Sequence, residues 1–300
     1  MKLLGRYKNG NMDVTIWNDG TKVRHTEDDE FKPAFGENCD MKITDRCDGG
    51  CQFCYEGCTT EGKHGDLFAY PNLLNSLHPY TELAINGNDL THPDLPKFLM
   101  FLKEKKVIAN MTVNQKHFEK HFEIIESLIV NEYIHGLGIS LVNPTDDFIA
   151  KVKCFPNAVI HVINGIITEE QLNKLADNNL KILILGYKEM ERGIKYLNEH
   201  DDEVNANKRW LYDNLISYVK KFKCLSFDNL ALSQLDVKRL MSEEEWNEFY
   251  MGDDGSFTFY IDMVEGTFGK NSLTPKDKRI PIGDKTIDEM FEIVKNTDWS

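Results

Sequence analysis

The feature that most restricts the fold is an alternation of short apolar strands and amphipathic helices through the middle of the chain. Six strand patterns, each followed by a helix or a helical stretch, occur at residues 39–43, 83–85, 107–113, 137–142, 158–163 and 180–185. Strands that alternate with helices pair in parallel, because each crossover returns the chain to the same edge of the sheet. The alternation predicts an α/β fold with helices outside a parallel sheet. It leaves open whether the six units form an open sheet or close part-way into a barrel.

The segments on either side have different patterns. Residues 1–36 contain the turn signals Asn9-Gly10 and Asp19-Gly20 and an alternating strand between them, which predicts a small N-terminal β-meander. Residues 229–300 combine helix-capping sequences with a strand pattern at 257–262 and a turn at Gly266, which predicts an α+β extension. The expected division is therefore 1–36, 37–228 and 229–300.

Composition narrows the class of protein. The 300 residues carry a net charge of −14, which opposes nonspecific binding to the phosphate backbone of a nucleic acid. No stretch of about 18 apolar residues is present, so no membrane span is expected. The N-terminus lacks the apolar run of a signal peptide, and seven cysteines then indicate a reducing cytoplasm.

Three of those cysteines form a motif directly after the first strand. Cys47, Cys51 and Cys54 have the spacing Cys-x3-Cys-x2-Cys, and the glycines at 49 and 50 allow the loop to wrap around a metal centre. Three thiolates leave a four-iron cluster one ligand short, which provides an open site for a small molecule. A zinc site that adds Cys58 is the alternative. Three other cysteines are interpreted as small buried residues: Cys39, Cys154 and Cys224.

With Phe53 before its third cysteine, this motif resembles the signature of the radical S-adenosylmethionine (radical SAM) family. The resemblance covers about residues 37–225 and implies a partial (βα)6 barrel with the cysteine loop after its first strand. It also implies that the three cysteines hold a 4Fe–4S cluster. Reductive cleavage of S-adenosylmethionine would then give a 5′-deoxyadenosyl radical that abstracts hydrogen from a substrate. An electron donor such as a flavodoxin or ferredoxin is an implied partner.

The resemblance also implies a set of cofactor-binding residues at the ends of successive strands. Asn86, Gly87 and Asn88 stand where the family often has Gly-Gly-Glu, and only the glycine matches, which puts the side-chain role of Asn88 in doubt. The remaining implied residues are Phe53 near adenine, Asn114 after the third strand, Ser140 in the fourth and Asn164 in the turn after the fifth. His92, at the start of the second helix, is interpreted as structural.

The substrate is not defined by these motifs. Lys63 and His64, between two glycines, and the thiol of Cys58 are candidate catalytic groups, with an ordinary turn and a structural cysteine as the alternatives. The C-terminal extension is similar to the SPASM extension of peptide-modifying members, but no cysteine follows Cys224 to hold a second cluster. We expect it to cover the barrel opening. A peptide or protein substrate is predicted, with a small metabolite or nucleotide as the alternative. A non-catalytic iron–sulfur or zinc protein is the competing class.

Overall fold

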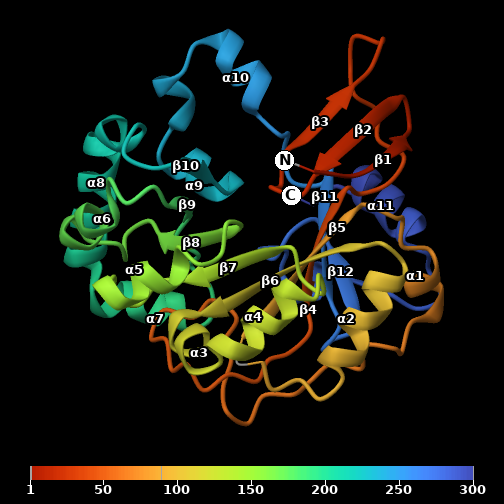
Figure 1. The fold of residues 1–300 in the computed structure, drawn as a ribbon, viewed down its shortest axis with the longest axis horizontal. Coiled ribbons are helices and arrows are strands. Elements are labelled where there is room, and N and C mark those ends of the chain that lie inside the picture. The colour runs from red at the N-terminus through yellow and green to blue at the C-terminus, as the bar shows by residue number, and fades with distance from the viewer. Residues whose placement is uncertain (1, 89, 300) are drawn as a thin grey trace.

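The computed structural model describes residues 2–88 and 90–299, and all elements below belong to these residues (Figure 1). They form a three-stranded antiparallel sheet and a ten-stranded mixed sheet. The strands of the small sheet are β1 (Leu3–Asn9), β2 (Met12–Trp17) and β3 (Lys22–His25). The strands of the large sheet are β4 (Asn38–Lys42), β5 (Glu82–Asn88), β6 (Ile108–Asn114), β7 (Gly136–Ser140), β8 (Ala158–Ile163), β9 (Lys181–Leu185), β10 (Cys224–Phe227), β11 (Thr258–Asp262), β12 (Thr267–Gly269) and β13 (Ile280–Pro281).

Helices connect consecutive parallel strands. They are α1 (Pro71–Asn75), α2 (Leu95–Glu104), α3 (Gln115–Lys120), α4 (Phe122–Val130), α5 (Asp146–Val152), α6 (Glu169–Leu175), α7 (Arg192–Glu199) and α8 (Asp201–Tyr218). The C-terminal part adds α9 (Asn229–Gln234), α10 (Glu243–Phe249), α11 (Ile287–Asn296) and the 3-10 turns η1 (Val237–Leu240) and η2 (Lys276–Lys278). None of the described helices has the length and apolar character needed to cross a membrane.

The order of the large sheet is β10-β9-β8-β7-β6-β5-β4-β11-β12-β13, and its strands are parallel from β10 to β11. Strands β4 to β9 coincide with the six expected strands, so the predicted α/β fold with a parallel sheet is confirmed. Strand β5 runs to Asn88 and is longer than expected, with a shift of register between Asn86 and Asn88. The longer strand therefore includes Asn86, Gly87 and Asn88.

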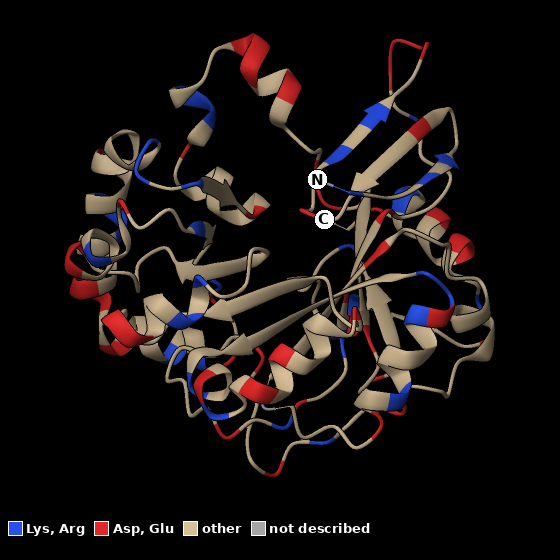
Figure 2. Ribbon diagram, viewed as in Figure 1, with Lys and Arg blue, Asp and Glu red and all other residues tan. Residues whose placement is uncertain are grey.

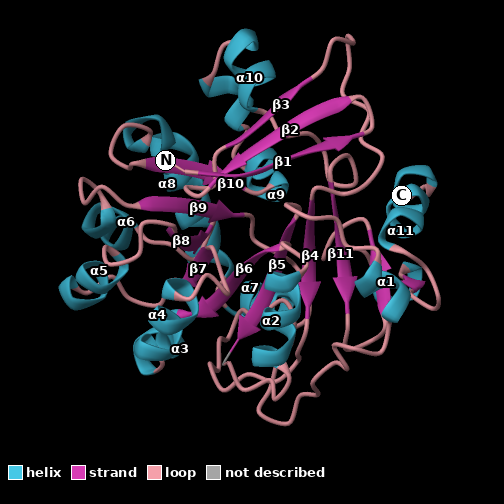
Figure 3. Cartoon of the chain, turned by 45° about the vertical axis from the view of Figure 1, so that its right-hand side comes forward, coloured by secondary structure: helices cyan, strands magenta, loops and turns pink. Residues whose placement is uncertain are grey.

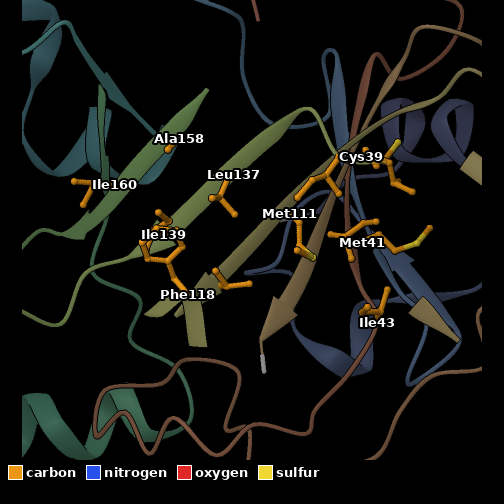
Figure 4. Packing of buried hydrophobic residues seen from close by; sticks show 14 of the residues in the cluster. Cys39, Met41, Ile43, Met111, Phe118, Leu137, Ile139, Ala158 and Ile160 are labelled. Carbon is orange, nitrogen blue, oxygen red and sulfur yellow. The ribbon is translucent and has the colours of Figure 1, made fainter. Parts of the chain in front are cut away.

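One face of the parallel sheet packs against the helices. Alternate residues of the strands, including Met41, Met111, Ile139 and Ile160, are fully buried in one hydrophobic cluster with helix residues such as Phe118 (Figure 4). This alternation is the reason that the strand pattern was visible in the sequence. Of the three cysteines interpreted as buried, only Cys39 is buried in this cluster. The prediction is wrong for Cys154 and Cys224, which are exposed at the end of α5 and at the start of the edge strand β10.

The predicted β-meander is confirmed as β1–β3, and it lies at the amino ends of the parallel strands (Figure 3). Lys22 Nζ lies 2.6 Å from the carboxylate of Glu82, the first residue of β5. Asn157, just before β8, donates to the carbonyl of Asn18 at 2.7 Å. Since parallel strands all end on the opposite side, the meander leaves their carboxyl ends free.

The C-terminal extension contributes to the large sheet itself. Strand β11 pairs in parallel with β4, from Thr258 opposite Asn38 to Asp262 opposite Lys42. The expected hairpin turn near Gly266 is present, since β11 and β12 are antiparallel neighbours. The loop after β12 reaches the far side of the sheet, where Ser272 accepts a hydrogen bond from Lys188 at 2.9 Å. The extension therefore adds strands to one end of the sheet and contacts the loop after β9.

Candidate functional site

The cysteine loop begins where β4 ends, at the carboxyl ends of the parallel strands. Backbone hydrogen bonds close it into a compact unit: Gly65 N–H donates to Ile43 at 2.9 Å, and Cys47 N–H donates to Thr59 at 2.9 Å. Gly50 has a φ of +66°, a conformation that L side chains rarely adopt. At Gly49 a Cβ would lie 3.2 Å from the Cys47 sulfur. The loop therefore favours glycine at position 50 because of its φ, and Gly49 lies close beside the Cys47 thiol.

The three motif thiols are partly buried in this loop, and none of them forms a disulfide. The side-chain amide of Asn114, at the end of β6, donates to the Cys51 sulfur at 3.5 Å. A hydrogen bond from Cys58 lowers the pKa of the Cys54 thiol to about 6. The same contact raises the pKa of Cys58, which is buried. Cys58 therefore touches the motif as a neutral thiol.

Basic side chains and a histidine from other elements hold the loop in place. Arg192, the first residue of α7, donates to the carbonyls of Cys51 at 3.1 Å and Cys58 at 2.9 Å. Lys116 Nζ donates to the carbonyl of Gly49 at 3.0 Å. The loop residue Asp48 bonds His117 of α3, and this hydrogen bond lowers the pKa of the Asp48 carboxyl. The positive charges of Lys116 and Arg192 thus lie near the Cys51 thiol and would offset the charge of its thiolate.

We expect Arg192→Met to loosen the cysteine loop of the metal-free protein. The substitution removes two hydrogen bonds from a charged donor, each worth about 1.5–3 kcal/mol, so local opening rises by about tenfold or more. Trypsin cleavage after the exposed residues Arg46 and Lys63 measures this opening. Arg209→Met, which changes an exposed arginine of α8, is the control. Equal cleavage rates in the two variants would show that Arg192 does not hold the loop.

The three thiols, the hydrogen bond to the Cys51 sulfur and the nearby positive charges suit a thiolate-bound iron–sulfur cluster. Hydrogen bonds to sulfur and nearby charge are features by which proteins adjust iron–sulfur clusters. In the described part of the chain, however, no three Cys, His, Asp or Glu side chains are arranged to hold a metal ion as they stand. Binding would therefore require the three thiols to turn toward a common centre, which the glycine-containing loop permits.

Two of the predicted cofactor-binding asparagines fasten the cysteine loop to the sheet. Asn86 accepts a hydrogen bond from Ile43 N–H at 2.8 Å. Asn88 has a φ of 43°, and its amide donates to the carbonyls of Thr44 at 3.2 Å and Arg46 at 3.4 Å and to the Cys58 sulfur at 3.6 Å. Gly87 lies between them in β5. The side-chain amide of Asn88 thus donates hydrogen bonds that an ionised glutamate could not donate.

The other predicted residues lie at the same end of the sheet. Asn114 and Ser140 are neighbours in register at the ends of β6 and β7. Asn164, after β8, is 1% exposed. Its side-chain Nδ2 donates to Gln234 of α9 at 3.0 Å, and its side-chain Oδ1 has no hydrogen-bond partner in the described chain. Phe53 packs edge-on against Tyr196 of α7, with ring centroids 5.7 Å apart. The parallel topology therefore brings these residues to one edge with the cysteine loop.

The catalytic candidates differ in their surroundings. His64 bonds the hydroxyl of Thr44 through Nδ1 at 2.8 Å, and its ring lies 4.8 Å from that of His92. Lys63 is exposed. His92 is 4% exposed and bonds the carbonyl of Gly65 at 2.8 Å, in agreement with its interpretation as a structural residue. A catalytic role for Lys63 or His64 stays a prediction.

Sequence reasoning missed Arg192, Lys116 and His117, which hold the loop. The signal for Lys116 and His117 was available, because both follow Asn114 at the start of the helix after β6. Arg192 is 141 residues from Cys51, and no local pattern connects the two. A further signal was the charged residue Asp40 between the buried strand residues Cys39 and Met41.

Comparison with known proteins gives a likeness of fold. No protein-family model matches the chain, and no curated protein matches it in sequence. Six chains of solved structures match it. One is SuiB of Streptococcus suis, in a crystal structure bound to S-adenosylmethionine, with a TM-score of 0.57 and 14% sequence identity. The match covers 89% of this chain and 67% of SuiB. At this identity the likeness shows a shared fold.

Proposed function

We propose that this chain is a radical SAM enzyme. The observation that carries the proposal is the position of the Cys47, Cys51 and Cys54 loop at the carboxyl ends of a parallel sheet, where βα folds bind their ligands. The fold shared with SuiB, a protein bound to S-adenosylmethionine in its crystal structure, supports the proposal. In this proposal the parallel strands form the partial barrel that the family resemblance implies.

The chemistry supplied by a 4Fe–4S cluster with S-adenosylmethionine is reductive cleavage to a 5′-deoxyadenosyl radical, with the electron from a donor such as a flavodoxin or ferredoxin. Cys47, Cys51 and Cys54 would hold the cluster. Lys116 and Arg192 would keep the loop closed through its carbonyls, as they do in the structure. Asn114 would donate its hydrogen bond to the Cys51 sulfur. A reducing cytoplasm, which keeps these thiols free, is part of the proposal.

The roles of the cofactor-binding residues are proposed from their shared edge. Asn114 and Ser140 would contact the methionyl carboxylate or ribose, and the turn at Asn164 would lie against adenine beside Phe53. Asn86, Gly87 and Asn88 would place backbone carbonyls near the methionyl amino group, because their two side chains already bind the cysteine loop. The substrate of this chemistry is proposed to be a peptide or protein, with a small metabolite or nucleotide as the alternative.

The test is anaerobic reconstitution of the full chain with iron and sulfide, followed by dithionite and S-adenosylmethionine. A brown protein that forms 5′-deoxyadenosine is the expected result. A colourless protein that retains zinc would overturn the proposal. Cys154→Ala, which changes an exposed cysteine at the end of α5, is the control for nonspecific iron binding by thiols. It should form the same amount of product as the natural sequence.

A further inference from the structure

The face of the parallel sheet opposite the helices, here called the inner face, is open to water. Along β6 the residues Met111 and Val113 on the helix side are buried, whereas Asn110 and Thr112 are partly exposed. The same alternation holds in β8 and β9, whose inner-face residues include the partly exposed His161. A packed interior would bury both faces. The inner face therefore borders a water-accessible space.

Asp40 is the charged residue of β4 that faces this space without a partner. Its neighbours Cys39 and Met41 are buried on the helix side, and Asp40 itself is exposed on the inner face. In the described part of the chain, its carboxylate makes no hydrogen bond and no ion pair. Enclosure by the surrounding protein raises the pKa of Asp40 to about 6, although Lys188 acts in the opposite direction. Most charges of the molecule lie instead on helices and loops (Figure 2).

The other carboxylates near Asp40 already have partners. Asp228 caps α9 by accepting a hydrogen bond from Ala231 N–H at 2.7 Å. Asp254 accepts hydrogen bonds from two asparagine amides at 2.7 and 2.6 Å. Glu56 of the cysteine loop lies 3.0 Å from Lys42 Nζ. Asp40 is therefore the carboxylate whose lone pairs remain available to a ligand.

Lys188, in the loop after β9, supplies a positive charge on the same side. Its ammonium donates to the hydroxyl of Ser272 at 2.9 Å and lies 3.9 Å from the ring centroid of Tyr55. Both partners are neutral, and Lys188 forms no ion pair with any residue from 2 to 88 or from 90 to 299. Lys188 thus reaches from the loop after β9 to the loop after β12, and its charge acts on Asp40 although the two side chains form no ion pair.

Charged side chains with a shifted pKa and no charged partner are concentrated at functional sites. We propose that Asp40 and Lys188 bind a zwitterionic substrate group, with an ammonium or guanidinium at Asp40 and a carboxylate at Lys188. This inference rests on the proposed function and narrows its substrate class to amino-acid-like molecules, including a peptide whose charged groups enter the inner face. Hydrogen bonds between charged partners give such a site both affinity and orientation.

S-Adenosylmethionine carries the same pair of groups at its methionyl end, so the position of the charges matters. Asp40 lies opposite Ala84 of β5, which lies opposite Asn110 of β6. Asn114, the predicted cofactor residue of β6, is four residues further on, or about 13 Å at 3.3 Å per residue. Asp40 is thus deeper than the edge that carries the cysteine loop. This depth favours a substrate group over the cofactor as the ligand.

The test is calorimetric titration of the metal-free full chain with ω-amino acids from glycine to 6-aminohexanoate. Their ammonium and carboxylate groups are separated by increasing distances, and butylamine and butyrate serve as probes with one charge. We expect at least one ω-amino acid to bind tenfold or more tightly than either single-charge probe. Asp40→Asn and Lys188→Gln should each weaken its binding by tenfold or more. Glu189→Gln, which removes an exposed charge next to Lys188, should not.

Two results would overturn the proposal. One is that the ω-amino acids bind no more tightly than butylamine and butyrate, or that both variants bind them as tightly as the natural sequence does. The other is competition by S-adenosylmethionine together with an equal loss of its affinity in both variants, which would assign the charges to the cofactor. The melting temperature of each variant checks its folding. Asp40→Asn should not lower the melting temperature, because the Asp40 carboxylate has no partner to lose. Since these titrations need no cluster, they remain informative even if no 5′-deoxyadenosine is formed.

Discussion

Cys51→Ala is expected to abolish both the brown cluster and the formation of 5′-deoxyadenosine, with a loss of product of at least about a thousandfold. Cys47→Ala and Cys54→Ala should behave alike, because a cluster that already lacks a fourth protein ligand would be left with two thiolates. The three thiols come from one loop and have no substitute nearby except Cys58. Iron and sulfide content after anaerobic reconstitution and product formation on reduction are the two measurements.

Cys58→Ala is the informative comparison, because Cys58 is four residues from Cys54 and its thiol contacts that of Cys54. If Cys58 were a fourth ligand, the protein would hold a closed cluster suited to electron transfer. We expect Cys58→Ala to retain iron, since the buried thiol is held by Asn88 and its pKa is raised. Loss of iron from Cys58→Ala as complete as that from Cys51→Ala would instead support the electron-carrier class.

Local patterns predicted the elements of the fold well. The capping boxes of the C-terminal segment, at Ser242 and Thr286, were readable because each involves residues three positions apart, and both are present in the structure. The six strands were readable because burial against the helices gives each strand alternating apolar residues. The cysteine loop could be placed at the carboxyl edge because it follows β4 directly.

Contacts between distant segments were not predictable in this way. The sequence indicated the hairpin of β11 and β12, whose strands are adjacent in the chain, but not that β11 pairs with β4 more than 200 residues earlier. The same holds for Arg192, whose two hydrogen bonds fix the cysteine loop. Strand pairing and loop anchoring at such separations depend on the complete fold, and no periodicity records them.

The pairing of β11 with β4 places a buried charge network beneath the cysteine loop. Asp262, at the end of β11, is fully buried and lies 2.9 Å from Arg279 and 3.6 Å from Lys42. Lys42, at the end of β4, also lies 2.5 Å from Asp45 and 3.0 Å from Glu56. Burial lowers the pKa of Lys42, but these carboxylates raise it by more than burial lowers it, so the ammonium stays charged. One buried carboxylate thus connects the extension to the loop.

Asp262→Ala is expected to lower the free energy of unfolding by about 3–5 kcal/mol, because it leaves the Arg279 guanidinium buried without its carboxylate and removes one of the three that surround Lys42. It also removes the acceptor for the N–H groups of Val264 and Glu265, each at 3.0 Å. Asp262→Asn keeps an acceptor oxygen and should cost less. Urea titration followed by circular dichroism measures the change.

Glu265→Ala, three residues away and exposed, is the matched control and should change stability by less than about 0.5 kcal/mol. If Asp262→Ala were no more destabilising than this control, the buried network would not hold the extension to the sheet. A large loss would have a second consequence. Because Lys42 binds both Asp262 and Glu56, loosening β11 would also loosen the cysteine loop, and iron incorporation should fall although no cysteine has changed.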